Sequence, residues 1–464
     1  MEITNNNEYS NEHFYKKVFK IGFPIMLAQL MSSLLSVIDS VMVSSLGDNA
    51  LVAVMVSGNF AFLLIMIEFG FLSGLSIFIA QYWGSKDIKN IHKVFMMASI
   101  IGVFVSIVFF TLGFFFPEFI IGLYDNTNDP VNSVILTEYG VSYLRVAAFS
   151  YFTMTITAVI GSLMRSVEKV VYPQIIAVIA VIINTFLNYC LITGHFGFPA
   201  LGVQGAAIAT LISSSFAALM MIAYLIKSKL EVFKIRLGVI KEITKEFVAR
   251  ILKKAMPVAI NETIWGLGMM FYLIAYGFIS KESIASVQIS NQVMGLFWVI
   301  NAGISTACAI MIGNKLGENK LNLAKAWGKR FMKLTLFAGV LLGVVLFILS
   351  DYIPLLFKDT TPLVRDNASL ILKVFSFYIP IKFSNALHIV GTLRAGGDTK
   401  YALFAELFPL WFIGVPLAFV LSIYTSLPLF IIVALVNIEE LVKFVIVLSR
   451  FFTFKWVHNL TVTT

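Results

Sequence analysis

Residues 16–29, KKVFKIGFPIMLAQ, reappear in altered form at residues 249–262 as ARILKKAMPVAINE, an offset of 233. The same offset continues downstream and pairs conformationally special residues: Pro24 with Pro257, Ser57 with Ser290, Gly70 with Gly303 and Gly84 with Gly317. Two unrelated apolar segments would not keep prolines and glycines in step over such a length. The pattern therefore indicates an internal duplication, in which each half builds the same structural unit.

The composition places the chain in a membrane. Of its 464 residues 59% are apolar, only 13% are charged and 43 are phenylalanine, more apolar surface than a soluble core can bury. The net charge of +9 then reflects membrane topology and contact with membrane lipids. We expect no nucleic-acid binding.

The hydropathy pattern predicts twelve membrane-spanning helices, because each apolar segment reaches the roughly 20 residues that a span requires. The predicted spans are 18–43, 50–80, 92–116, 132–160, 170–193, 202–226, 251–279, 284–313, 328–350, 364–391, 401–424 and 427–450. We therefore expect an all-α integral membrane protein of two pseudo-symmetric six-helix bundles. An even number of spans per half makes the repeats parallel, with their axis along the membrane normal.

The basic residues give the orientation. Lysine and arginine collect in every second loop, whereas the other loops contain only Lys281, Lys358 and Arg365. The positive-inside rule then puts both termini in the cytoplasm of a multi-pass cell-membrane protein. The predicted organisation is a polar cytoplasmic tail (1–15), an N-lobe (16–227), a partly amphipathic cytoplasmic linker (228–250), a C-lobe (251–453) and a second tail (454–464).

Motifs for catalysis are absent from the sequence. Cys190 and Cys308 are single cysteines in apolar segments, which is typical of small buried side chains rather than a metal site. The five histidines lack ligand spacing, no phosphate-binding loop is present, and residues 1–15 do not resemble a signal peptide. We expect neither an enzyme nor an organic cofactor.

A candidate cation site follows from the polar residues inside the spans. Asp39 is a carboxylate in the outer part of the first span, where an ionisable side chain is costly and indicates an ion or substrate site. Asn184 and Asn188 lie one turn apart on one helix face, and Thr210 enters at similar depth. Hard oxygen donors of this kind suit a small cation such as Na⁺ rather than zinc.

Two alternatives apply to these polar residues. Asn184, Asn188 and Thr210 could simply form interhelical hydrogen bonds, which such residues often do in membranes. Glu262, which follows Pro257 by about one turn, is a candidate for substrate binding or ion coupling, and a structural hydrogen bond is its alternative role.

Four stretches resemble the multidrug and toxic compound extrusion (MATE) family. They are SVIDSVMVSSLGDNALVAV (36–54), AQYWGSKD (80–87), NTFLNYCLITGHFGFPALGVQGAAIAT (184–210) and GTLRAGGDTK (391–400). The resemblance implies an antiporter that exports small organic cations by alternating access in exchange for Na⁺ or H⁺. We expect it to function as a monomer.

The resemblance also implies roles for particular residues. A family cation site in the N-lobe carries over to Asp39, Asn184, Asn188 and Thr210, although some members have a second aspartate where this chain has Asn188. A C-lobe glutamate found in some members falls on Trp265 in this chain, about one turn beyond Glu262, so the resemblance does not carry its role onto Glu262. Glu262 and Trp265 are both candidates for a substrate or coupling site.

A second class of transporter remains open. A flippase for lipid-linked oligosaccharides or other amphiphiles, from the wider superfamily, would share the duplicated helical lobes. Such proteins often have additional spans and more basic residues in their cavities. The few basic residues inside the spans of this chain favour cation efflux.

Overall fold

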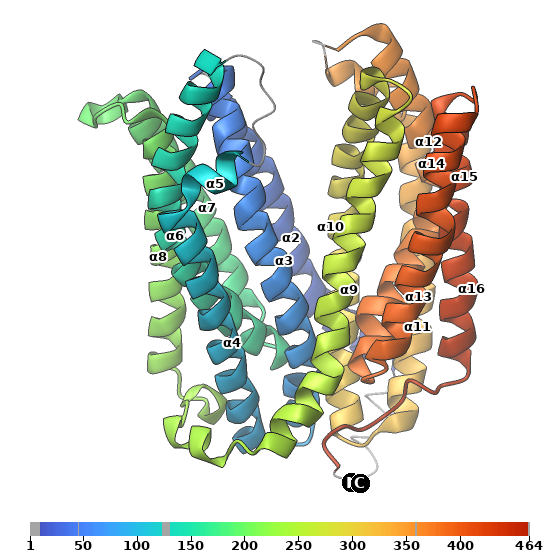
Figure 1. Ribbon diagram of the computed structural model, residues 1–464. Helices are drawn as coiled ribbons and strands as arrows, with labels where there is room; N and C mark the ends of the chain where they lie inside the picture. Colours follow the sequence, from blue (N-terminus) through green and yellow to red (C-terminus); the bar gives the residue numbers. More distant parts are fainter. Residues whose placement is uncertain (1–9, 45, 123–129, 358–359, 463–464) are drawn as a thin grey trace. The chain divides into compact units, whose positions relative to one another are not determined.

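The computed structural model describes residues 10–44, 46–122, 130–357 and 360–462, which form helices joined by short connections, with no strand in these ranges (Figure 1). The helices of the first half are α2 (Asn11–Ser44), α3 (Asp48–Gly84), α4 (Ile88–Phe115), α5 (Pro117–Gly122), α6 (Pro130–Ser166), α7 (Val171–Thr193), η1 (His195–Gly197), α8 (Gly202–Lys227), η2 (Glu231–Phe233) and η3 (Leu237–Glu242). Those of the second half are α9 (Lys245–Gly277), α10 (Lys281–Gly317), α11 (Leu321–Leu349), η4 (Ile353–Leu356), α12 (Pro362–Ala386), η5 (Leu387–Leu393), α13 (Thr399–Pro409), η6 (Leu410–Gly414), α14 (Val415–Tyr424), α15 (Leu429–Val436) and α16 (Ile438–Phe452).

The prediction of an all-α membrane protein is confirmed. Ten helices among the described residues are long and apolar enough to cross a bilayer, and α2 and the α15–α16 pair occupy the first and last predicted spans. Large apolar side chains such as Phe104, Phe337 and Phe412 are more than 60% exposed, as expected where lipid is the solvent. A helix suits this environment because it satisfies its own backbone hydrogen bonds.

Three predicted spans are not continuous α-helices: two contain a π-helical segment and one is broken into two helices. In α12 and α13, which contain Pro380 and Pro409, the α-helix changes into the π-helical segments η5 and η6. Proline removes a backbone donor, and a π-turn is one way in which a helix accommodates that loss. The last span breaks at Asn437, whose side-chain nitrogen donates to the Val433 carbonyl at 2.7 Å and competes with the helical pattern.

The residues form two compact units. The first-half unit contains residues 27–79 and 87–248. The second-half unit contains the described residues up to Met26, residues 80–86 and the described residues from Ala249 onward. Helices α2 and α3 are therefore shared between the units. The boundaries of these units differ from those of the predicted lobes, 16–227 and 251–453, and the lobes stay a prediction. Residues 1–9, Lys358 and residues 463–464, which belong to predicted tails and loops, lie outside the described ranges.

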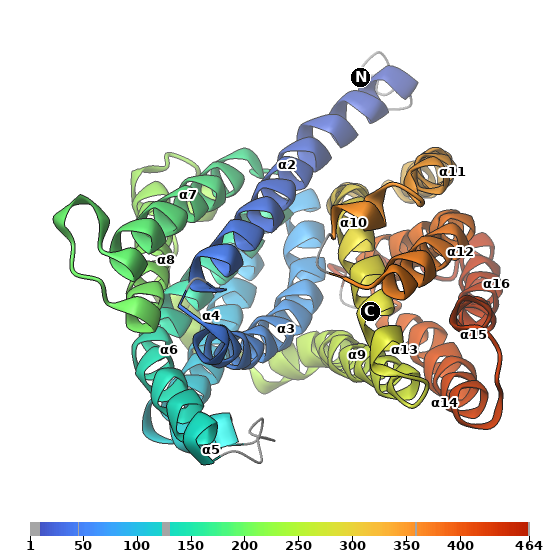
Figure 2. The ribbon, with the colours of Figure 1, turned by 90° about the horizontal axis from the view of Figure 1, so that it is seen from above.

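Each unit has its own apolar core. In the first-half unit, α6 packs against α4 and α8, and its core includes Phe60, Phe109 and Tyr151. In the second-half unit, α12 packs against α10, α11, α15 and α16, as Figure 2 shows from above. Phe375 and Phe383 lie in its core.

The segment between the halves is largely 3-10 helical and irregular. Helices η2 and η3 lie here, and α9 begins at Lys245. Val232 and Phe233 are buried, and the Val232 carbonyl contacts the His92 ring at 3.1 Å. Glu242 forms ion pairs with Lys89 (2.7 Å) and Lys93 (3.6 Å), and the hydrogen bond from Lys89 lowers the pKa of this exposed carboxyl.

Two repeat-related glycines bring the ends of α3 and α10 into backbone contact. A Cβ atom on Gly84 would lie 2.0 Å from the Asn314 carbonyl oxygen, and one on Gly317 would lie 1.8 Å from the Gln81 carbonyl oxygen. The Gln81 side chain donates to the carbonyls of Ala395 (2.7 Å) and His458 (3.2 Å) and accepts from the Leu460 backbone N–H (2.6 Å). The same helix end therefore holds the C-terminal segment in place.

We predict that Gly317→Ala destabilises the protein, because a methyl group cannot fit against the Gln81 backbone without moving α3. Overpacking of this kind typically costs about 1–3 kcal/mol. Gly295→Ala, in the same helix α10 but with nothing within 4 Å of the added Cβ, is the matched control and should leave stability unchanged or slightly raised. Thermal unfolding in detergent measures both variants; equal midpoints would contradict the close contact.

Candidate functional site

Asp39 lies on α2 and is contacted from α7. The Thr185 hydroxyl donates to Asp39 Oδ1 at 3.0 Å. With its nitrogen turned toward Asp39, the Asn184 amide donates to Oδ2 at 3.0 Å, while its oxygen accepts from the Thr210 backbone N–H at 3.2 Å. The carboxylate therefore has a neutral hydrogen-bond donor on each oxygen.

The other predicted site residues extend the same group. Asn188 is one turn further along α7, with its amide 3.3 Å from that of Asn184, and the Asn184 amide lies 3.4 Å from Thr210 Oγ1. Asn188 is only 4% exposed, so its amide is buried beside that of Asn184.

The electrostatics around Asp39 favour a positive ligand. No lysine, arginine or histidine of the described ranges compensates its charge. Leaving an ionised carboxylate uncompensated within a membrane is expensive, so the group either carries a proton or holds a cation. One carboxylate with neutral amide and hydroxyl oxygens around it is a donor set that fits Na⁺ or H⁺.

Asp39, Asn184, Asn188 and Thr210 were predicted from sequence and lie together in the structure. Thr185 was missed. Thr185 is three residues before Asn188, and Asn184 is four residues before it. Both spacings place a side chain beside Asn188 on the helix surface, so this spacing was the available signal.

Of the predicted site residues of the second half, Glu262, unlike Asp39, lies beside a basic residue. Glu262 and Trp265 are both partly buried on α9. Glu262 Oε1 accepts from Arg394 Nη2 at 2.5 Å, and the side chains are 12% and 2% exposed. The charge of Glu262 is therefore compensated within its own unit, unlike that of Asp39.

Further polar contacts continue this network between helices. Asn261 donates to Glu406 at 2.5 Å. On α16, Lys443 lies 3.3 Å from Glu440 and 3.6 Å from Glu439, and Asn385 of α12 donates to Glu440 Oε2 at 2.7 Å. The grouping of Glu439, Glu440 and Lys443 on α16 can be predicted from helical spacing. The contacts with Asn385 of α12, and between Asn261 and Glu406 of α13, cannot be predicted in this way.

A family model described as MatE matches residues 24–190 and 257–420. The two matched ranges begin at Pro24 and Pro257, the prolines that the internal repeat aligns, so each half of the chain matches the model separately. Together these ranges cover most of the chain.

Similar proteins match along nearly their whole length. "Probable multidrug resistance protein YoeA" of Bacillus subtilis is 26% identical over 408 residues, covering 87% of this chain and 86% of the relative. "Probable multidrug resistance protein NorM" of Thermotoga maritima is 23% identical over 417 residues, covering 89% and 87%. The solved "Outward-facing conformation of a multidrug resistance MATE family transporter of the MOP superfamily" has a TM-score of 0.82 at 19% identity, covering 95% and 96%. At this identity the structural likeness shows the fold.

We predict that Arg394→Met destabilises the protein by about 3–5 kcal/mol, because it leaves Glu262 as a buried charge without compensation. The double variant Arg394→Met/Glu262→Met should recover part of the loss. Arg145→Met breaks the exposed pair with Glu118 (3.0 Å) and is the control, expected to cost about 1 kcal/mol or less. Thermal unfolding distinguishes them; a double variant less stable than Arg394→Met would show that the pair is not the source of the effect.

Proposed function

Because the chain belongs to the MatE family, we propose that it is a cation-coupled multidrug antiporter, exporting small organic cations in exchange for Na⁺ or H⁺. The names of the similar bacterial proteins support multidrug efflux as the activity class. The coupling ion is proposed to bind at Asp39, with Thr185, Asn184, Asn188 and Thr210 supplying neutral oxygens.

The observation that carries this proposal is the uncompensated carboxylate of Asp39. It accepts from neutral donors, and the buried Asn188 amide lies on the same face of α7. An ion arriving at this site would compensate the charge of the carboxylate. The site is therefore built to gain free energy when a cation binds.

Coupling requires that the ion distinguish two conformations of the transporter. A ligand that binds both conformations equally shifts neither, whatever its affinity. We propose that the oxygens from α2, α7 and α8 come together in one conformation and separate in the other. Export of an organic cation then proceeds through the conformation that the ion disfavours, which is the basis of alternating access.

In the second half, Glu262 and Trp265 could contact the substrate, but they add no uncompensated charge. Glu262 is paired with Arg394, so a cationic substrate would have to compete with the guanidinium to bind it. Trp265 is partly buried on the same helix and offers an aromatic face for a cation. The rival function, flipping of lipid-linked oligosaccharides, would require a substrate path rich in cationic groups, and the uncompensated charge at Asp39 is of the opposite sign.

The remaining expectations complete the proposal. The transporter is a multi-pass protein of the cell membrane, with both termini proposed to be cytoplasmic. We propose that one chain suffices for activity and that it works without an organic cofactor.

We predict that Asp39→Asn abolishes ion-driven uphill transport, lowering the rate at least tenfold, because the amide can neither carry a proton nor neutralise a cation. Proteoliposomes with an imposed Na⁺ or H⁺ gradient and a fluorescent organic cation measure this rate. Asp351→Asn is the matched control: Asp351 is exposed, and its hydrogen bond from Lys373 (2.7 Å) keeps the pKa of its carboxyl below the usual value. Full uphill transport by Asp39→Asn would refute the proposed site.

We predict that Asn188→Leu identifies the coupling ion. A Na⁺ ion needs several oxygens, so loss of the Asn188 oxygen should raise the half-saturating Na⁺ concentration several-fold. A proton needs only the carboxylate, so proton-driven transport by the variant should keep its dependence on pH. Measuring the rate against Na⁺ concentration and against pH in the same proteoliposomes separates the two ions.

A further inference from the structure

A second acid, Glu68, lies inside the first-half unit, away from the group around Asp39. Glu68 is on α3 and only 6% exposed. Its Oε1 is in hydrogen-bond contact with the Thr155 hydroxyl of α6, which is 2.5 Å from the Ser106 hydroxyl of α4. The contacts of Glu68 thus come from α4 and α6, whereas those of Asp39 come from α7.

Nothing in the described ranges neutralises Glu68 by ion pairing. The charged or basic residues of α4 and α6 are Lys89, His92, Lys93, Glu138, Arg145 and Arg165. Arg145 and Arg165 are each ten residues from Thr155, about 15 Å along the helix axis, and Arg145 pairs with Glu118. Tyr151 is one turn from Thr155, and its carbonyl accepts from the Thr155 hydroxyl at 2.8 Å.

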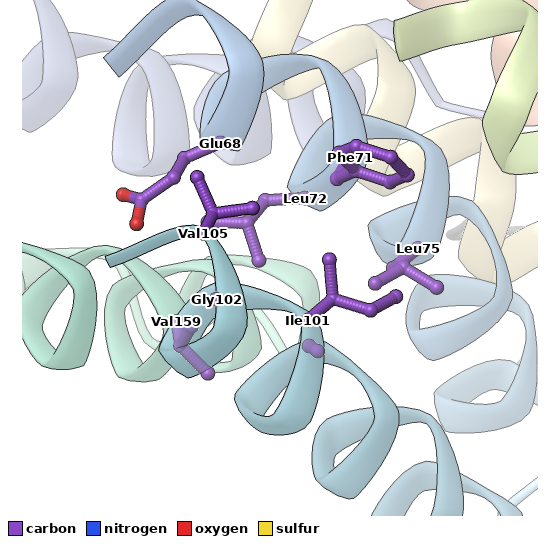
Figure 3. Close-up of a pocket in the computed structure, with 9 residues that line it drawn as sticks. Glu68, Phe71, Leu72, Leu75, Ile101, Gly102, Val105 and Val159 are labelled. Carbon is purple, nitrogen blue, oxygen red and sulfur yellow. The ribbon is translucent and has the colours of Figure 1, made fainter. Parts of the chain in front are cut away.

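The space beside Glu68 is too small and too apolar to hydrate a carboxylate. Figure 3 shows Glu68 at a pocket whose other labelled side chains are apolar, and the cavity has a volume of about 10 Å³. That is the lower limit for one water molecule, which would also need two or more polar partners. Among the described residues that line the cavity Glu68 is the one acid, and the exposed wall of the cavity is apolar.

The oxygen atoms around Glu68 make more close contacts than the two hydroxyl groups have hydrogens. Four oxygen contacts link Glu68 to Thr155, Thr155 to Ser106 (2.5 Å), Thr155 to the Tyr151 carbonyl (2.8 Å) and Ser106 to the Gly102 carbonyl (2.9 Å). The two hydroxyls supply only two hydrogens, so an ionised Glu68 would leave two close contacts between acceptors. A protonated Glu68 adds a third hydrogen: Glu68 donates to Thr155, Thr155 to the Tyr151 carbonyl, and Ser106 to Thr155. One contact, between Ser106 and the Gly102 carbonyl, then lacks a hydrogen, against two in the ionised state.

We propose that Glu68, Thr155 and Ser106 form an occluded proton-binding site, separate from the site at Asp39. The ligand is a single proton on the Glu68 carboxyl, and the Thr155 hydroxyl accepts a hydrogen bond from Glu68 and a second one from Ser106. Gly102 permits the close approach of α4 and α6 that seals the site, since a Cβ atom there would lie 2.8 Å from Thr155 Cγ2. This inference does not depend on the proposed drug transport.

Infrared difference spectroscopy of the full-length protein at pH 7 tests the site. Wild type minus Glu68→Gln should contain the C=O stretching band of a protonated carboxylic acid. The control Glu138→Gln, which removes an exposed acid on α6, should instead remove carboxylate bands. Thr155→Val should keep the Glu68 band but shift its frequency, because the hydroxyl partner is gone.

Two outcomes would overturn the proposal. If Glu68→Gln removes carboxylate bands, Glu68 is ionised and the hydrogen count is wrong. If Asp39→Asn abolishes the Glu68 band, the two acids form one site. Persistence of the band in Asp39→Asn, whether or not that variant transports, supports a separate site and distinguishes this inference from the coupling role of Asp39.

Discussion

The structure depends on one constraint: the bilayer supplies no water to charges and polar groups within it. Helices satisfy their backbone internally, so the difficulty falls on side chains at depth. The two units meet this difficulty in different ways. The second-half unit carries its acids together with bases, as in Glu262 with Arg394 and Glu440 with Lys443. Within the described part of the first-half unit, Asp39 and Glu68 have neutral hydrogen-bond partners and no base.

This difference separates structural charges from ligand-binding ones. A paired acid and base are satisfied without any ligand, so their helices are held in register whether or not an ion is present. An acid surrounded by amides and hydroxyls is satisfied only when a proton or a metal ion joins it. The uncompensated acids are therefore the groups at which we propose that ions bind, and both of them, Asp39 and Glu68, lie in the first half of the chain.

The sequence predicted the fold class, the duplication and most of the helix positions, because hydropathy and the alignment of Pro24 with Pro257 are local signals. It also predicted that Asp39, Asn184, Asn188 and Thr210 would lie close together, since depth in the membrane can be counted from helix rise. It did not predict that Arg394 pairs with Glu262, which is 132 residues away. Such a pairing depends on helix rotation and tilt, which no sequence periodicity specifies.

The contact between α3 and α10 bears on the ancestry of the chain. Gly84 packs on Asn314 and Gly317 packs on Gln81, and the offset of 233 relates Gly84 to Gly317 and Gln81 to Asn314. Such a reciprocal contact is the kind that a two-fold symmetric dimer makes with one surface. It is the contact expected if two identical half-length copies preceded the fused chain. Once both copies lie in one chain, their sequences are free to diverge, and Asp39 in the first half is matched by Tyr272 in the second.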